Sequence, residues 1–118
     1  MHEGHFTERI VEAIVKEISK QPGRAVESVT VKVGEAYHVE PDSVLLHFDL
    51  ISKETQLEGV KLNLVEVPMQ IFCKECGKQG PVEDHHLLLC SFCQSRRVKA
   101  VSGDTVTIEK IVFKENSV

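Results

Sequence analysis

Two pairs of cysteines constrain this sequence more than any other feature. Cys73 and Cys76 form the motif CKEC, and Cys90 and Cys93 form CSFC after thirteen intervening residues. Two residues between cysteines let a tight turn direct both sulfur atoms at one ion, and two such turns supply the four thiolates of a tetrahedral zinc site. Gly77, directly after the first pair, suits this turn. The spacing predicts a Zn(II) site; two redox dithiols or a pair of disulfides are the alternatives.

A site with four thiolate ligands has no open coordination position, so the predicted zinc is structural and not catalytic. The segment 70–101 contains all four cysteines, several turn-forming residues and little helical periodicity. We expect it to form an inserted zinc-ribbon-like module of short strands, ordered by metal binding worth roughly 10–16 kcal/mol. Zinc therefore accounts for this segment and leaves the function of the protein open.

The rest of the chain has the periodicity of an α+β domain. Apolar residues recur at helical spacing over 6–20 and again over 41–53, where Pro41 suits a first helical position. Alternating apolar residues predict strands in VESVTVKVGEAY, VKLNLVEV and TVTIEKIVF. We expect two helices packed on a three-stranded sheet, formed by residues 1–69 together with 102–118. A parallel crossover and an antiparallel pairing both fit this element order, so the pairing of the strands stays open.

Charge and hydropathy limit the partners. The 14 Lys and Arg against 18 Asp and Glu give a net charge of -4, which argues against nonspecific nucleic-acid binding. No apolar run reaches the roughly 18 residues of a membrane span, and the first residues lack the apolar stretch of a secretory leader. We therefore expect a cytoplasmic protein with no membrane partner, in which clustered cysteines more often bind metal than form disulfides.

The sequence begins MHEGHF, which places metal-binding groups directly before a predicted helix. The amino group of Met1 and the amide and imidazole nitrogens of His2 can chelate one ion in fused rings. The amide nitrogen of Glu3 can complete a plane of four nitrogens, a geometry that suits Ni(II) or Cu(II) better than zinc. The alternative is that His2 is an exposed polar residue near the terminus, and the dipeptide by itself favours that alternative.

Several motifs together resemble one family. An MHE start before an amphipathic helix, then VGE, a Pro-Asp helix start, CKEC, CSFC and GDTVTIEKI follow one another along nearly the whole chain at suitable spacings. In this combination the sequence resembles the HypA/HybF family, nickel metallochaperones for maturation of nickel–iron hydrogenase and, in some organisms, of urease. The resemblance implies two metal sites: a structural zinc site in the four-cysteine module, and a separate site for Ni(II) as transiently bound cargo.

The resemblance also implies which residues bind nickel. Residues 1–3 would hold the ion, with His2 required, and Glu40 stands near the position of a family carboxylate at the start of the second helix, with Asp42 close by. Gly4 and His5 depart from the residues usual after MHE, and His5 is a further candidate nickel ligand.

The implied partners are a nickel-handling maturation GTPase of the HypB type and the hydrogenase large-subunit precursor, with urease maturation factors in some organisms. The implied protein is not an enzyme, and we find no nucleophile–base constellation or phosphate-binding loop in the sequence. The other hypotheses are a zinc-ribbon module that binds proteins or nucleic acids without a specific nickel site, and a redox protein that uses its cysteine pairs. The remaining histidines are interpreted as packed or exposed polar residues rather than metal ligands: His38, His47, His85 and His86.

Overall fold

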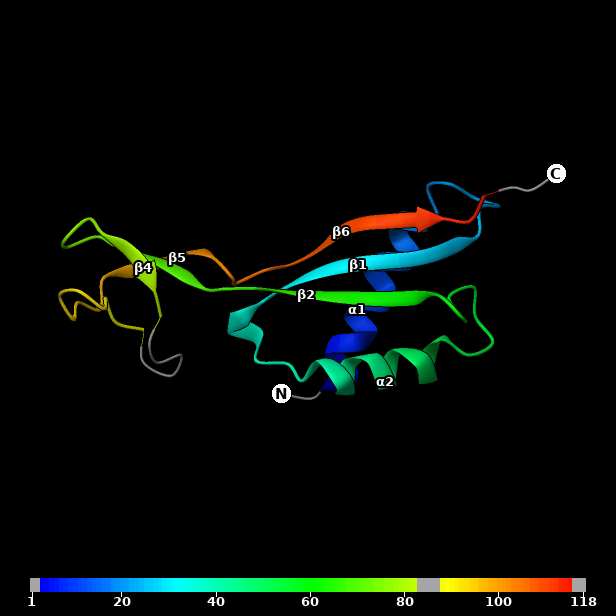
Figure 1. Cartoon of the computed structure of the whole chain (residues 1–118), viewed down its shortest axis with the longest axis horizontal. Coiled ribbons are helices and arrows are strands. Elements are labelled where there is room, and N and C mark those ends of the chain that lie inside the picture. The colour runs from blue at the N-terminus through cyan, green and yellow to red at the C-terminus, as the bar shows by residue number, and fades with distance from the viewer. Residues whose placement is uncertain (1–2, 83–87, 116–118) are drawn as a thin grey trace. The chain divides into compact units, whose positions relative to one another are not determined.

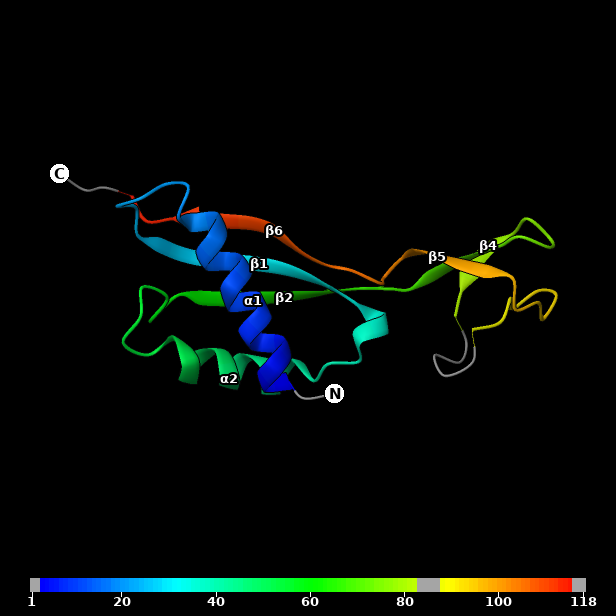
Figure 2. The same ribbon diagram turned by 180° about the vertical axis from the view of Figure 1, so that it is seen from behind.

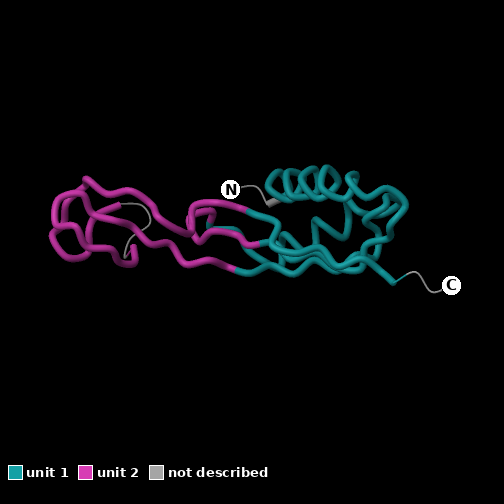
Figure 3. The backbone as a smooth tube through the Cα atoms, turned by 90° about the horizontal axis from the view of Figure 1, so that it is seen from above, with its two compact units in different colours: residues 1–31, 38–65, 107–118 teal, residues 32–37, 66–106 magenta. Residues whose placement is uncertain are grey.

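The computed structural model describes residues 3–82 and 88–115, and the chain divides into two compact units (Figure 3). The first unit comprises residues 1–31, 38–65 and 107–118, and the second comprises residues 32–37 and 66–106. The second unit thus includes segments outside the module expected at 70–101. Whether that module is a domain in its own right stays a prediction.

The first unit is built on a mixed three-stranded sheet with the order β2-β1-β6. Its elements are α1 (Glu3–Ile18), β1 (Val26–Gly34), α2 (Pro41–Ser52), β2 (Lys61–Val67) and β6 (Val106–Phe113). Figure 1 shows β1 and β2 running in the same direction, with α2 in the connection between them, whereas β6 runs the opposite way. A hydrogen bond of 2.8 Å from Lys114 N to Ala25 O joins the end of β6 to the start of β1. Both kinds of pairing that the sequence left open therefore occur in one sheet.

The core of the first unit lies between the sheet and the two helices, which contact each other (Figure 2). Apolar residues spaced four apart form the buried face of α1: Phe6, Ile10, Ile14 and Ile18. Alternate residues of the part of β1 that belongs to this unit are buried as well: Val29 and Val31. From α2, Val44 and Phe48 complete this core. The predicted α+β arrangement of two helices on a three-stranded sheet is confirmed, because both apolar periodicities form packing faces.

The observed ends of two elements differ from the predicted ones. α1 begins at Glu3, three residues before the predicted start at Phe6. The prediction began too late because Gly4 and His5 are not apolar and so add nothing to the helical pattern. β1 ends at Gly34, and Glu35–Tyr37 form a 3₁₀ turn instead of continuing the predicted strand. Neither α-helix in the described part of the chain is both long and apolar enough to span a membrane.

The second unit contains a small antiparallel sheet with β3 at its centre. Its strands are β3 (Gln70–Cys73), β4 (Gln79–Pro81) and β5 (Val98–Ser102), in the order β4-β3-β5. A small apolar cluster supports this sheet, formed by Met69, Ile71 and Val82 with Ala36, Val98 and Ala100 packed against it. The expected short strands of the four-cysteine segment are therefore present, and their apolar core is slight.

Three backbone segments of the second unit meet where β1 ends. Gly34 N donates to Thr105 O at 2.8 Å, and Ala36 N donates to Gly103 O at 3.0 Å. A Cβ atom on Gly34 would overlap the backbone of Gly103, and a Cβ atom on Gly103 would overlap the backbone of Met69. Glycine is therefore required at both positions. This close approach ends the strand, although the apolar alternation gives no sign of it.

Replacing Gly103 with alanine is expected to destabilise the second unit by about 2–5 kcal/mol. Gly103 has a φ of 78°, which costs an alanine about 1–2 kcal/mol, and overlap with the Met69 backbone adds about 1–3 kcal/mol. Gly77→Ala is the matched control, because Gly77 has a φ of 73° and a Cβ atom added there would have no neighbouring atom within 4 Å. Urea unfolding followed by NMR signals of the second unit would measure both variants. Equal losses in the two variants would contradict the overlap.

Candidate metal centre

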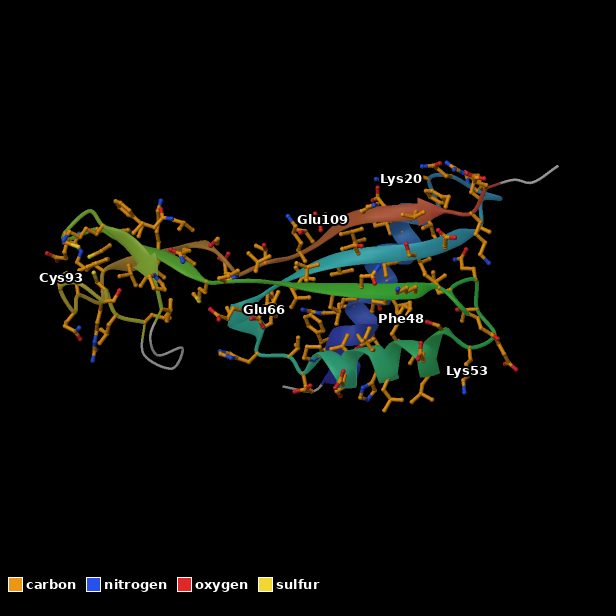
Figure 4. All side chains as sticks on the ribbon, viewed as in Figure 1. Lys20, Phe48, Lys53, Glu66, Cys93 and Glu109 are labelled. Carbon is orange, nitrogen blue, oxygen red and sulfur yellow. The ribbon has the colours of Figure 1, made fainter. Side chains whose placement is uncertain are left out.

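The four cysteine sulfur atoms gather in one place in the second unit, where Figure 4 labels Cys93. The Sγ atoms of Cys73, Cys76, Cys90 and Cys93 all lie within 4.8 Å of one another. The Sγ atoms of Cys73 and Cys93 are 3.6 Å apart, as are those of Cys76 and Cys90. A tetrahedral zinc site with metal–sulfur distances of about 2.3 Å has edges of about 3.8 Å. The four thiols are free, and their spacing fits one tetrahedral ion.

The first cysteine pair occupies a tight turn that follows β3. Gly77 N donates to Cys73 O at 3.0 Å, and Cys73 N donates to Lys78 O at 2.9 Å. The Cys76 amide donates to Cys73 Sγ at 3.4 Å, so the backbone itself favours a thiolate at Cys73. Gly77 adopts a left-handed conformation with a φ of 73°, as predicted for the residue after the pair.

The second cysteine pair repeats the same turn with different residues. Gln94 N donates to Cys90 O and Cys90 N donates to Ser95 O, each at 2.9 Å, and the Phe92 amide donates to Cys90 Sγ at 3.3 Å. Gln94 occupies the position equivalent to Gly77 and has a φ of 65°. A non-glycine residue in this conformation costs about 1–2 kcal/mol. The turn is therefore imposed by the surrounding structure and not by the preference of Gln94.

Within each pair, the pKa of the first cysteine is lowered and the pKa of the second is raised. The hydrogen bond from the Cys76 amide lowers the pKa of Cys73. Burial raises the pKa of Cys90, but backbone amides outweigh it and bring that pKa to about 7. A backbone amide lowers the pKa of Cys93, but burial and the three neighbouring sulfurs outweigh it and raise that pKa to about 12. The pKa of Cys76 is also raised. Four thiolates cannot gather here without a cation that offsets their repulsion.

The surface beside the cysteines combines an aromatic ring with basic side chains. Lys78 Nζ lies 4.9 Å from the centroid of the Phe92 ring, and that ring is 56% exposed. Arg97 forms an exposed ion pair of 3.2 Å with Glu75, and its carbonyl oxygen accepts the Lys74 amide at 2.8 Å. The closed sulfur cluster leaves no coordination position for a substrate, whereas this surface is open to a partner.

The family model described as "Hydrogenase/urease nickel incorporation, metallochaperone, hypA" matches residues 1–113. The chain belongs to the HypA family. It is 30% identical over 117 residues to hydrogenase maturation factor HypA of Dehalococcoides mccartyi, which covers 99% of this chain and 98% of that relative. It is 29% identical over 114 residues to hydrogenase maturation factor HypA of Actinobacillus succinogenes, covering 97% of this chain and 100% of that relative.

Solved structures of the HypA family have the same fold. The solution structure of the Ni metallochaperone HypA from Helicobacter pylori has a TM-score of 0.70 at 18% identity, with 96% of this chain and 97% of that chain covered. A further solution structure of a HypA protein has a TM-score of 0.67, also at 18% identity. The resemblance found in the sequence is thus confirmed. The chain is a member of a hydrogenase-maturation metallochaperone family, and its four-cysteine cluster is consistent with zinc.

Three of the expected nickel ligands, Glu3, His5 and Glu40, lie at the starts of the two α-helices in the part of the chain that the structure describes. Met1 and His2 lie outside the residues that the structure describes. Glu3 is the first residue of α1, and His5 is exposed on the same turn. Glu40 is exposed at the N-cap of α2, with an extended backbone and no capping hydrogen bond from its side chain. These assignments stay predictions.

The other histidines differ in their surroundings. His85 and His86 lie outside the described residues, and His38 is exposed. His47 is half-buried on α2, and its Nδ1 atom lies 2.8 Å from Ser43 O. The periodicity of α2 could not predict the surroundings of His47, because its ring lies beside Gly4, which is distant in sequence.

Proposed function

We propose that this chain is a nickel metallochaperone that binds Ni(II) at its N-terminus and delivers it for maturation of nickel–iron hydrogenase. The observation that carries the proposal is a family match that begins at residue 1 and is described by nickel incorporation. The same description names urease, which we propose as a second client in organisms that contain it.

The proposed nickel site uses nitrogen atoms of the first three residues. The Met1 amino group and the amide and imidazole nitrogens of His2 chelate the ion, and the Glu3 amide completes a planar set that suits Ni(II). α1 begins at Glu3, and the first amides of a helix have no carbonyl acceptor within it. The Glu3 amide is therefore available to the metal. The exposed side chains of His5 and Glu40 are further ligands in this proposal.

The four-cysteine site is proposed to hold structural Zn(II). Its closed tetrahedron supplies folding energy to the second unit and leaves no position for a reacting group, so we assign the chain no catalysis of its own. The free thiols support a cytoplasmic location, where thiols stay reduced.

Nickel delivery requires docking to the protein that gives or receives the ion. We propose a maturation GTPase of the HypB type and the hydrogenase large-subunit precursor as partners, with urease maturation factors for the second client. The exposed ring of Phe92 and the neighbouring Lys78 form a candidate docking surface. Phe92 lies in the second cysteine turn and Lys78 follows the first, so a bound zinc ion would fix both positions. Aromatic residues are enriched at protein interfaces.

Nickel binding is expected to depend on the native terminus. Zinc-loaded, untagged protein should bind one Ni(II) with a planar-type absorption spectrum. Acetylation of the Met1 amino group, or His2→Ala, should weaken binding by more than about tenfold, or about 1.4 kcal/mol, because each change removes a chelating nitrogen. Calorimetry and absorption titrations measure the affinities. Equal nickel binding by all three proteins would refute the proposed site.

A further inference from the structure

The two cysteines of each pair differ in their access to solvent. The second cysteine of each pair, Cys76 or Cys93, is exposed. The first, Cys73 or Cys90, is buried. An oxidant in solution therefore reaches the second sulfur of each pair before the first, because thiol oxidation follows exposure and thiolate character. A thiol that coordinates a metal is deprotonated, so the proposed zinc site supplies this thiolate character at all four positions.

Each exposed sulfur lies close to the buried sulfur of the other pair. The Sγ atoms of Cys93 and Cys73 are 3.6 Å apart, and those of Cys76 and Cys90 are also 3.6 Å apart. The sulfur atoms of a disulfide are about 2.05 Å apart, so a movement of about 1.5 Å closes each of these gaps. Both contacts join the two cysteine turns across the cluster. The fold therefore prepares two crossed disulfides, Cys73–Cys93 and Cys76–Cys90.

The unfolded chain favours a different pairing of the same cysteines. The two cysteines of each CxxC motif are separated by only two residues, whereas thirteen residues lie between the motifs. Closing a short loop costs less chain entropy than closing a long one, so disulfides within each motif are favoured when no fold holds the sulfurs. Crossed disulfides would therefore show that the folded arrangement of the two turns directs the pairing.

We propose that Cys76 and Cys93 are modification sites for hydrogen peroxide, and that their oxidation releases zinc and leaves the two crossed disulfides. This regulation rests on the zinc site of the proposed function. The exposed thiolate attacks peroxide: an S–O bond forms as the O–O bond breaks, and the departing hydroxide takes a proton to become water. The buried thiolate of the other pair then attacks this sulfenic acid. The S–S bond forms as the S–O bond breaks, and the second hydroxide also leaves as water.

The complete reaction balances over the four cysteines. Four thiolates, two molecules of hydrogen peroxide and four protons give two disulfides and four molecules of water, and four electrons pass from sulfur to the peroxide oxygens. Thiolates are the form of cysteine that binds metals, so the zinc ion leaves as Zn(II) with its charge unchanged. The crossed disulfides keep the two turns tied together without the metal. A dithiol reductant with added zinc restores the original cluster.

The experiment treats native, zinc-loaded, full-length protein with hydrogen peroxide. A chromogenic chelator follows the released metal, and the zinc content should fall from one ion per chain to nearly none. Trypsin cleaves after Lys74 and chymotrypsin after Phe92, and each of these residues lies between the two cysteines of a pair. Digestion with both proteases therefore places the four cysteines on separate peptides. Mass spectrometry should find the Cys73 peptide joined to the Cys93 peptide, and the Cys76 peptide joined to the Cys90 peptide.

Two controls separate the outcomes. The same protein oxidised in guanidinium with a chelator present should form mainly disulfides within each pair, and crossed disulfides there as well would show that the fold does not direct them. The oxidised native protein should keep dispersed ¹H–¹⁵N NMR signals from the second unit, whereas reduced protein treated with a chelator should lose them. Disulfides within the pairs, sulfinic acids or lost dispersion in the oxidised native protein would overturn the crossed pairing while leaving the zinc site intact. A protein that takes up no zinc before oxidation would instead overturn the zinc site itself.

Discussion

Cys73→Ser is expected to lose zinc and to unfold the second unit while the first unit stays folded. Cys73 is fully buried, ends β3 and faces Cys93 at 3.6 Å. Without Cys73 the ion retains only three thiolates. Zinc binding orders such modules with a free energy of roughly 10–16 kcal/mol, and most of that free energy would be lost. The apolar cluster of this unit is too small to replace that energy. Zinc analysis by mass spectrometry and a ¹H–¹⁵N NMR spectrum would show both effects.

Ser95→Ala serves as the control for this result. The Ser95 hydroxyl accepts the Arg97 amide at 3.0 Å on the exposed surface, so its removal leaves all four sulfurs in place. This variant should keep one zinc and a dispersed spectrum. Removing zinc from the native protein with a chelator should reproduce the Cys73→Ser spectrum. A Cys73→Ser protein with full zinc content and native dispersion would show that the cluster does not hold the unit together.

Phe48→Ala is expected to destabilise the first unit by about 3–5 kcal/mol, the range for removing a large buried aromatic side chain. Phe48 is 1% exposed and is among the largest fully buried side chains of the protein. Figure 4 shows it on α2, on the side toward the sheet. Because total stabilities are only about 5–15 kcal/mol, the loss would bring the unit close to unfolding. Urea titration followed by circular dichroism at the helical band reports on α1 and α2.

Leu46→Ala, on the same helix, is the control for the core. Leu46 is 59% exposed, so truncating it should change the unfolding free energy by only about 0.5 kcal/mol. Zinc content should remain at one ion in both helix variants, because the cysteines belong to the second unit. Similar losses from Phe48→Ala and Leu46→Ala would mean that the predicted buried face of α2 is wrong.

Local patterns in the sequence were sufficient for much of this architecture. Helical spacing predicted the buried face of α1, alternation predicted that of β1, and two short cysteine motifs predicted one cluster of four sulfurs. These features depend on residues only a few positions apart. The backbone periods of 3.6 and 2.0 and the geometry of a two-residue spacer fix them wherever the segment lies.

Only the tertiary structure decided which distant segments meet. The order β2-β1-β6, the contact of Gly34 with Gly103, and the place of His47 beside Gly4 each join residues far apart in sequence. Gln94 adopts a left-handed backbone conformation that glutamine disfavours, because the second cysteine turn has the same backbone geometry as the first. Such contacts follow from how helices and strands pack and how closely backbones approach. No short stretch of residues encodes these relations, whereas the two cysteine motifs are encoded locally.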